Sequence, residues 1–403
     1  MLSLSDIEAA RDRVSDVALE TALGYQRNFS RMTGADVQVK FENSQRTGSF
    51  KIRGATNRIR KLTEEERADG VITASAGNHA QGVALAARHS DVDALIVMPE
   101  FAPISKVNAT RSYGAEVELY GEDYADAQAR AHELGDQSDR TYVHAYEDRD
   151  VQAGQGTIGL EIVDQCPEVD TVVVPIGGGG LISGIATAVK GRKPDTRVIG
   201  VQAEGAATVA NSLDKGATEE LDSVDTIADG IATGAVGEHT LPIIDERVDE
   251  IVMVDDSQIA SAMVLLLERA KTLVEGAGAV PIAALMENKF DYEEDETIVP
   301  VLSGGNIDLN LLTTVLSRGL VDRGRFVKLR TVMKDRPGAL EEFLDIVADS
   351  GANIYEINHD RARQSFAIDA TEIEIDLETR GHEHVDEILS ELRAAGFQVE
   401  VRT

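Results

Sequence analysis

The sequence predicts an α/β protein with parallel sheets covered by helices, followed by a smaller domain of βαββαβ order. From about residue 70 to about residue 320 the chain repeats one unit: an apolar strand-like run, a turn rich in Gly, Ser or Asn, and a helical segment. The repeat stops at residues 319–325, and a different pattern follows. With 403 residues, the chain is also long enough for two or three domains that each bury a core.

The repeated unit is clearest at residues 70–89, 94–114, 169–191 and 296–319. Strands that alternate with helices favour a parallel sheet, because each connecting helix packs back onto a face of that sheet. In such sheets, ligands bind outside the carboxyl ends of the strands. The turns rich in Gly, Ser and Asn fall at these ends, so we expect the functional site there.

The C-terminal segment has a different order of elements, and we expect it to fold as a separate domain. Its strand-like runs alternate apolar and polar residues, whereas its helical segments carry apolar residues at helical spacing. This order, within about 75 residues, is that of the ferredoxin-like split unit. The expected elements are a strand at 326–335, a helix at 337–351, strands at 353–362 and 371–380, a helix at 384–396 and a strand at 397–403.

The composition excludes several classes of function. The 71 acidic and 39 basic residues give a net charge of -32, which repels a phosphate backbone, so no nucleic acid partner is expected. The acids are dispersed, a pattern that resembles halophilic proteins, whose self-repulsion is screened at high salt. The sequence contains neither a long apolar run nor a cationic N-terminal signal, so we expect no membrane partner and a cytoplasmic location. The single cysteine, Cys166, is expected to pack at a helix end beside Pro167.

Lys51 is the first candidate for chemistry. It stands in SFKIRGA between Phe50 and Ile52 rather than among charged residues. Burial there would remove water from the amine and lower its pKa, towards the neutral nucleophile that attacks a carbonyl group. An ordinary surface lysine beside an aromatic residue is the commoner situation, because lysine is seldom buried. Lys51 alone therefore does not decide the function.

Four consecutive glycines, Gly177–Gly180, join the apolar run TVVVP to a helical segment. Their unobstructed backbone N–H groups and the positive end of a helix suit a phosphate group. A tight turn needs one or two glycines, so four favour a phosphate site. The loop matches neither the Walker pattern nor the dinucleotide fingerprint, so we expect a single phosphate. The segment GQGTIG at 154–159 has the dinucleotide spacing, but polar residues precede it, and we interpret it as packing at a helix start.

Two further loops end predicted strands. SAGNHAQG contains Ser75, Gly77, Asn78 and His79, and SGGN begins with Ser303. Asn78 and Ser303 offer neutral hydrogen-bonding groups to a small ligand. Each loop taken alone is more typical of a helix-capping turn, and His79 is more typical of a structural residue than of a catalytic one.

Together, these loops and their spacing resemble the fold-type II pyridoxal-phosphate enzymes, which have the tryptophan synthase β-like fold, and specifically the threonine dehydratases (threonine ammonia-lyases). The resemblance extends over nearly the whole chain. It implies a catalytic domain at residues 1–320, in which a small subdomain at about 50–147 is inserted into a large one. It also implies that residues 326–403, with the turn DRPGAL, form a regulatory ACT domain.

The resemblance assigns a role to each candidate residue. Lys51 would bind pyridoxal 5'-phosphate covalently and, once substrate displaces it, would act as the general base. The loop of Ser75, Gly77 and His79 would bind the substrate, with its carboxylate at Ser75. The other implied cofactor contacts are Phe50 stacked on the ring, Asn78 at the ring 3-oxygen, Ser303 at the ring nitrogen, and Gly177, Gly178, Gly179, Gly180 and Leu181 at the phosphate.

The implied reaction is the dehydration and deamination of L-threonine to 2-oxobutanoate and ammonia, with serine as a second substrate. A serine at the ring nitrogen cannot hold a proton there as an aspartate would, which favours elimination over transamination. Serine racemases of this family carry a second serine where this chain has Ala76, so racemisation is not expected. Relatives that bind a cation use acidic residues at positions that here are Gln202, Ala206 and Thr208, so we expect no metal.

Two alternatives stay open: a β-replacement enzyme such as a cysteine synthase, and a non-catalytic amino-acid sensor. Domains of the ACT type commonly pair across subunits, so a homodimer or homotetramer is expected. We also expect isoleucine, opposed by valine, to bind the C-terminal domain and control turnover. There, Pro337 and Gly338 would open a helix whose N–H groups receive a carboxylate, and Asn353 and Ile354 would supply a polar and an apolar contact.

Overall fold

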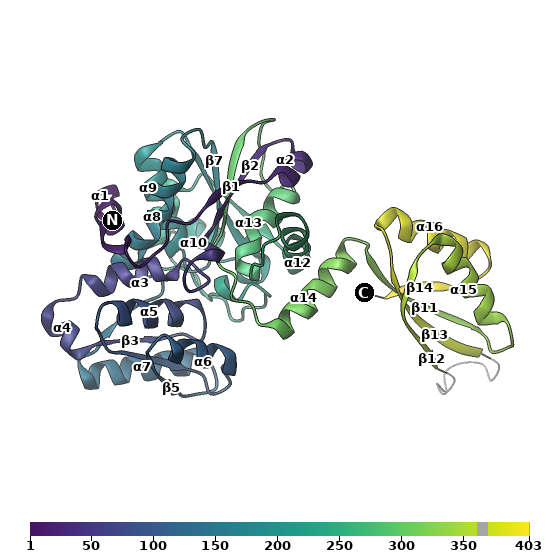
Figure 1. The fold of residues 1–403 in the computed structure, drawn as a ribbon, viewed down its shortest axis with the longest axis horizontal. Coiled ribbons are helices and arrows are strands. Elements are labelled where there is room, and N and C mark those ends of the chain that lie inside the picture. Colours follow the sequence, from purple (N-terminus) through teal and green to yellow (C-terminus); the bar gives the residue numbers. More distant parts are fainter. Residues whose placement is uncertain (361–369, 403) are drawn as a thin grey trace. The chain divides into compact units, whose positions relative to one another are not determined.

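The computed structural model describes residues 1–360 and 370–402, which form two compact units, Met1–Asp308 and Leu309–Thr403. Figure 1 traces both. The first unit is α/β with parallel sheets and the second has an antiparallel sheet, so the predicted fold class is confirmed. The division precedes α14 (Leu309–Asp322), so this helix belongs to the second unit, although the sequence pattern places it in the first domain. None of the helices within the described ranges is long and apolar enough to cross a membrane.

The larger sheet of the first unit has six strands, all parallel to their neighbours except the first, which is antiparallel to the second. Its two central strands are buried along their whole length, as expected where helices cover both faces. In sheet order the strands are β1 (Leu23–Tyr25), β2 (Asp36–Phe41), β10 (Thr297–Leu302), β7 (Thr171–Pro175), β8 (Arg197–Ala203) and β9 (Glu250–Val254). The helices of this subdomain are α1 (Leu4–Val14), α2 (Arg27–Thr33), α8 (Arg149–Gln165), α9 (Gly180–Arg192), α10 (Val209–Lys215), α11 (Leu241–Arg247), α12 (Asp256–Leu265) and α13 (Gly276–Met286).

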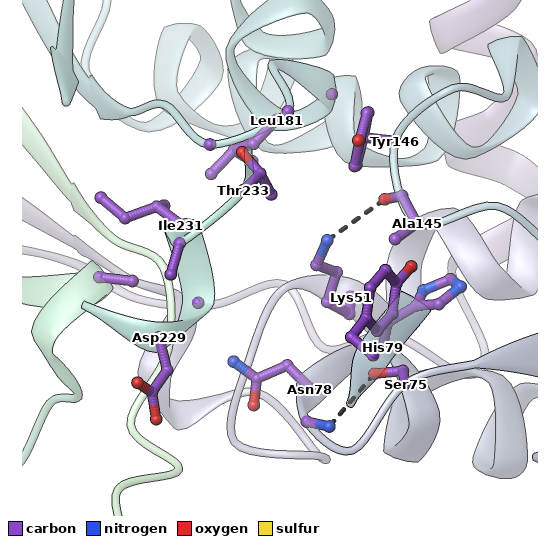
Figure 2. Close-up of a pocket in the computed structure, with 18 of the residues that line it drawn as sticks. Lys51, Ser75, Asn78, His79, Ala145, Tyr146, Leu181, Asp229, Ile231 and Thr233 are labelled. Carbon is purple, nitrogen blue, oxygen red and sulfur yellow. Dashed lines mark hydrogen bonds between the residues drawn. The ribbon is translucent and has the colours of Figure 1, made fainter. Parts of the chain in front are cut away.

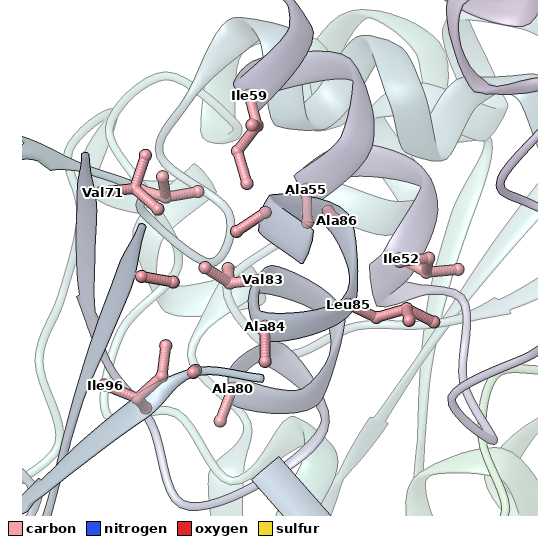
Figure 3. Packing of buried hydrophobic residues seen from close by; sticks show 14 of the residues in the cluster. Ile52, Ala55, Ile59, Val71, Ala80, Val83, Ala84, Leu85, Ala86 and Ile96 are labelled. Carbon is pink, nitrogen blue, oxygen red and sulfur yellow. The ribbon is translucent and has the colours of Figure 1, made fainter. Parts of the chain in front are cut away.

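The smaller sheet has four parallel strands and lies within the predicted insertion at 50–147. Its core joins apolar residues of the sheet to those of the helices beside it, as Figure 3 shows for Val71 and Ile96 against Val83. In sheet order the strands are β5 (Glu116–Leu119), β4 (Ala94–Met98), β3 (Val71–Ala74) and β6 (Thr141–Tyr142). The accompanying helices are α3 (Lys51–Arg60), α4 (Glu64–Asp69), α5 (Asn78–His89), α6 (Ile104–Ser112) and α7 (Tyr124–Ser138).

Helix α3 joins the two subdomains, because it packs against α5 of the small one and α8 of the large one (Figure 1). Ile52, Ala55 and Ile59, spaced three and four residues apart, enter the core of the small subdomain (Figure 3). On the side of α8 the backbones approach closely: a Cβ atom on Gly54 would lie 2.6 Å from the carbonyl oxygen of Val151. The start of α3, where Lys51 lies, is therefore held between the two subdomains.

The segment GQGTIG does serve packing, as the sequence predicts. A Cβ atom on Gly154 would lie 2.6 Å from the carbonyl oxygen of Arg53, and one on Gly159 would lie 2.8 Å from that of Ile185. However, the segment lies inside α8 and not at its start. Asp148 caps the helix by accepting hydrogen bonds from two backbone N–H groups, so α8 begins before the glycines.

The second unit has the predicted βαββαβ order, with all strand pairs antiparallel in the order β12-β13-β11-β14. Alternate residues of β11 are buried, and they pack against Phe343, Val347 and Ile388 of its helices. Of the predicted strands, Arg361, Ala362 and Thr403 lie outside the described residues. The elements are β11 (Phe326–Lys334), α15 (Ala339–Ser350), β12 (Asn353–Asp360), β13 (Ala370–Glu378), α16 (His382–Ala394) and β14 (Val399–Arg402).

Candidate active site

A cavity of about 580 Å³ lies in the first unit, where loops at the carboxyl ends of β3 and β7 meet the start of α3. Figure 2 shows side chains of both subdomains around it. Every residue that the sequence predicts for the site lines this cavity: Phe50, Lys51, Ser75, Gly77, Asn78, His79, Gly177, Gly178, Gly179, Gly180, Leu181 and Ser303. The structure thus brings together residues more than two hundred positions apart, whereas their contacts with a cofactor stay a prediction.

Lys51 is the first residue of α3, and its Nζ donates a hydrogen bond to the carbonyl oxygen of Ala145 at 3.2 Å (Figure 2). Burial lowers the pKa of this amine to about 8, although the carboxylate of Glu275 opposes the shift. The backbone of Lys51 also packs closely against α5: a Cβ atom on Gly82 of that helix would lie 3.0 Å from the carbonyl carbon of Lys51. This contact holds the start of α3 in place. Lys51 therefore presents an amine that loses its proton readily, at a fixed point of the cavity wall.

Phe50 precedes this lysine and is buried in the core of the large subdomain. Its backbone N–H donates to the carbonyl oxygen of Ser303 at 3.1 Å, which ties the start of α3 to the end of β10. The Nζ of Lys51 lies 5.1 Å from the centroid of the Phe50 ring. The aromatic ring, the amine and Ser303 are thus neighbours, as the predicted roles require.

The four-glycine loop connects β7 to α9, so the positive end of α9 faces the cavity. Packing gives a second reason for the glycines: a Cβ atom on Gly178 would lie 2.5 Å from the ring of Tyr146. Gly179 has φ +88°, a conformation that side chains disfavour, and its Cβ would lie 2.7 Å from the Oγ1 of Thr240. The number of glycines therefore reflects close packing as well as an open row of amides.

The loop after β3 is shaped by its own side chains. The Oγ of Ser75 accepts a hydrogen bond from the backbone N–H of Gly77 at 3.2 Å (Figure 2). The Nε2 of His79 lies 2.8 Å from the carbonyl oxygen of Val143. Burial, together with the charge of Lys51, lowers the pKa of His79 to about 3, so the ring is neutral at neutral pH. His79 lines the cavity, but this contact supports the structural role that its sequence context favours.

Glu275 is a site residue that the sequence interpretation missed. It precedes the first residue of α13, where its side chain makes no capping hydrogen bond, and its Oε1 accepts a hydrogen bond from the Nδ2 of Asn78 at 2.6 Å. Burial raises the pKa of its carboxyl to about 7. Tyr146 and Asp229 also line the cavity without having been predicted. The only sequence signal for Glu275 is an acid directly before the apolar helix GAGAVPIAALM, which resembles an ordinary helix start.

At the positions where the sequence predicts that cation ligands are missing, the structure shows internal hydrogen bonds. The Nε2 of Gln202 donates to the carbonyl oxygen of Ala206 at 3.2 Å, and its Oε1 accepts from the N–H of Val209 at 3.0 Å. Within residues 1–360 and 370–402, no cluster of three or more His, Cys, Asp or Glu side chains could hold a metal ion. The expected lack of a metal stays a prediction.

Comparisons with known proteins agree with this geometry. The family model described as "Pyridoxal-phosphate dependent enzyme" matches residues 14–304. The L-threonine ammonia-lyase of Thermotoga maritima is 46% identical over 401 residues, and that of Geobacter sulfurreducens is 47% identical; each alignment covers 100% of both chains. Among solved structures, the processed threonine deaminase isoform 2 of Solanum lycopersicum has a TM-score of 0.76 and 42% identity, covering 78% of this chain and 86% of that one. Maize serine racemase has a TM-score of 0.75 and 35% identity, covering 79% and 98%.

Proposed function

This chain belongs to the pyridoxal-phosphate-dependent enzymes, and on that basis we propose that it converts L-threonine to 2-oxobutanoate and ammonia, with L-serine as a second substrate. The observation that carries the proposal is the amine of Lys51, with its lowered pKa, in a cavity that also contains a four-glycine loop. Relatives that align along the whole chain are named for this activity on threonine.

The cofactor is pyridoxal 5'-phosphate, and the residues of the cavity fit it. Gly177–Gly180 place no side chains between the start of α9 and the cavity, which suits a phosphate. Lys51 is the amine that would hold the aldehyde carbon, Phe50 lies beside that amine, and Asn78 and Ser303 would contact the polar atoms of the ring. When bound, the cofactor supplies an electron sink that stabilises the negative charge left at the substrate α-carbon.

Residues of the chain carry out the proton transfer and bind the substrate. The Nζ of Lys51 removes the proton from the α-carbon, a step that a lowered amine pKa permits near neutral pH. The bond from the β-carbon to the hydroxyl group breaks, and that group leaves with a proton as water. Hydrolysis of the unsaturated amine product consumes one water and releases ammonia and 2-oxobutanoate. The carbonyl of Ala145 orients Nζ, and the loop of Ser75 receives the substrate carboxylate.

Incubating the full chain and its cofactor with threonine, with serine, and with O-acetylserine plus sulfide tests the proposal. We expect 2-oxobutanoate from threonine and pyruvate from serine, each with one equivalent of ammonia. Inversion of serine should be slow, because Ala76 stands where racemases have a second serine. Cysteine formed from O-acetylserine, without 2-oxobutanoate from threonine, would indicate a β-replacement enzyme. No product from any substrate would indicate a sensor.

The proposal includes control of turnover by isoleucine, opposed by valine, at the C-terminal unit. Helix α15 begins after Gly338, whose φ is +87°, and nothing lies within 4 Å of the position that a Cβ would take there, so the first turn is open to a carboxylate. Ile354 is exposed, and the exposed Asn353 donates to Glu378 at 2.9 Å.

We also propose that the chain forms a dimer or tetramer, because β12 is an edge strand with exposed apolar side chains. A cytoplasmic location is a further part of the proposal.

We expect isoleucine to inhibit the full chain, and to have no effect on a truncation that ends at Arg325. A coupling of about 1 to 3 kcal/mol between the two sites would change the apparent threonine affinity roughly 5- to 150-fold. The measurement is initial rate against threonine concentration, with and without isoleucine or valine. Equal rates of the full chain with and without isoleucine would reject the control, and undiminished inhibition of the truncation would place the effector elsewhere.

A further inference from the structure

The carboxyl of Glu275 lies in the cavity wall beside Asn78, and glycines leave room for it. Its backbone N–H donates to the carbonyl oxygen of Gly304 at 3.1 Å. A Cβ atom on Gly304 would lie 2.2 Å from its Oε1, and one on Gly230 would lie 3.2 Å from the same atom. Any larger residue at Gly304 would therefore displace the carboxyl. The two glycines leave the space that this side chain occupies.

A directed chain of hydrogen bonds ends at Glu275. The Nδ2 of Asn306 donates to the carbonyl oxygen of Thr47 at 2.6 Å and to the Oδ1 of Asn78 at 2.8 Å. Because a backbone carbonyl can only accept, the amide of Asn306 has one orientation, and this fixes the amide of Asn78 as well. The Nδ2 of Asn78 must then face Glu275, to which it donates at 2.6 Å. This leaves Asn78 one N–H group to offer to a bound ligand.

Charged groups from three other elements act on this carboxyl. They are Lys51 at the start of α3, Lys106 of α6 and Asp229 of the turn at 229–231. Burial is the largest influence and raises the pKa of Glu275; Asp229 adds to the rise, while the bond from Asn78 and the two lysines oppose it, leaving the pKa at about 7. The carboxylate of Glu275 in turn acts to raise the pKa of Lys51.

We propose that Glu275 is a positioning residue for proton abstraction: held by Asn78, its carboxylate stabilises the ammonium that Lys51 forms when it takes the substrate α-proton. This role rests on the proposed function, since it requires Lys51 to be the base. The sign of its pH dependence follows from the chemistry. Above a pH of about 7 the pKa of Glu275 makes it an anion, which increases the basicity of Lys51. Below that pH it is neutral, and the assistance is lost.

The test compares the full-length holoenzyme with Glu275→Gln, in which an amide oxygen can still accept from Asn78 but no charge forms. Wild-type kcat/KM for threonine is expected to fall as the pH drops through about 7, because the carboxyl then gains a proton. The variant is expected to lack this limb and to be roughly tenfold slower at about pH 8, which corresponds to one pKa unit of Lys51 basicity. The absorbance band of the lysine-bound cofactor should change near the same pH in the wild type. In Glu275→Gln, titrated over the same range, that change should be absent.

Glu287→Gln at the exposed far end of α13 is the matched control and should behave as wild type. Profiles of Glu275→Gln and wild type that superimpose, or a variant that is slower by the same factor at every pH, would overturn the proposal. The outcome is separate from that of the proposed function, because wild-type turnover of threonine is established first. A wild type that turns over threonine with no limb near pH 7 would also overturn the role of Glu275 and leave the reaction intact.

Discussion

Replacing Lys51 by alanine should lower threonine turnover by at least a thousandfold. General-base catalysis contributes about 10²- to 10⁴-fold by itself, and the substitution also removes the amine that would attach the cofactor. The structure supports both roles, since the Nζ lies in the cavity and burial lowers its pKa to about 8. The measurement is single-turnover and steady-state formation of 2-oxobutanoate with saturating cofactor.

Lys61→Ala is the control for this variant. Lys61 lies at the other end of α3, where its exposed side chain forms an ion pair with Asp150, so its removal should leave turnover near wild type. If Lys51→Ala keeps more than about one hundredth of wild-type turnover, the general-base role is contradicted, since its lower bound alone is about a hundredfold.

Replacing Arg53 by methionine should cost about 3 to 5 kcal/mol of unfolding free energy, the usual effect of removing one partner from a buried ion pair. Arg53 is fully buried on α3. Its Nη2 donates to the Oε1 of Glu42 at 2.8 Å and to the Oε2 of Glu161 at 2.9 Å. Lys40, also fully buried, donates to that Oε2 at 2.6 Å. Two cations thus balance two carboxylates, and the substitution leaves both carboxylates with one lysine.

Chemical denaturation of the full chain measures this difference. Arg11→Met is the matched control, because the side chains of Arg11 and its partner Asp164 are 43% and 54% exposed, and such pairs contribute about 0 to 1 kcal/mol. The two substitutions remove the same guanidinium from a buried and an exposed pair. If Arg53→Met lowers the unfolding free energy by less than about 1 kcal/mol, the buried ion pairs contribute no more than exposed ones, and the account of this network is wrong.

The sequence predicts the fold well because its signals are local. Apolar runs such as VITA and TVVVP are buried throughout in the structure, and the turns after them line the cavity. In the C-terminal unit, β11 shows the alternation expected of a sheet with one covered face. Local sequence patterns do not show the boundary between the units. Helix α14 has helical periodicity like the helices before it, and only the tertiary contacts assign it to the second unit.

The missed parts of the site depend on contacts that no single segment shows. Glu275 is defined by Asn78 and Gly304, which lie on other elements, and Tyr146 by its contact with the four-glycine loop. The buried network is equally hidden, because Lys40 and Arg53 resemble surface cations until the fold brings both of them to Glu161 of α8. Local patterns thus predict which loops meet, but not which polar side chains pair there.

The most direct test of the proposed chemistry is to find which residue holds the cofactor. The full chain is loaded with pyridoxal 5'-phosphate, reduced with borohydride to make the bond permanent, digested and analysed by mass spectrometry. We expect one pyridoxyl group per chain on the peptide that contains Lys51, and less of this label when borohydride is added during turnover of saturating threonine, since bound substrate displaces the lysine. A label on any other lysine, or a label on Lys51 that is equally strong with and without saturating threonine during turnover, would contradict the assignment.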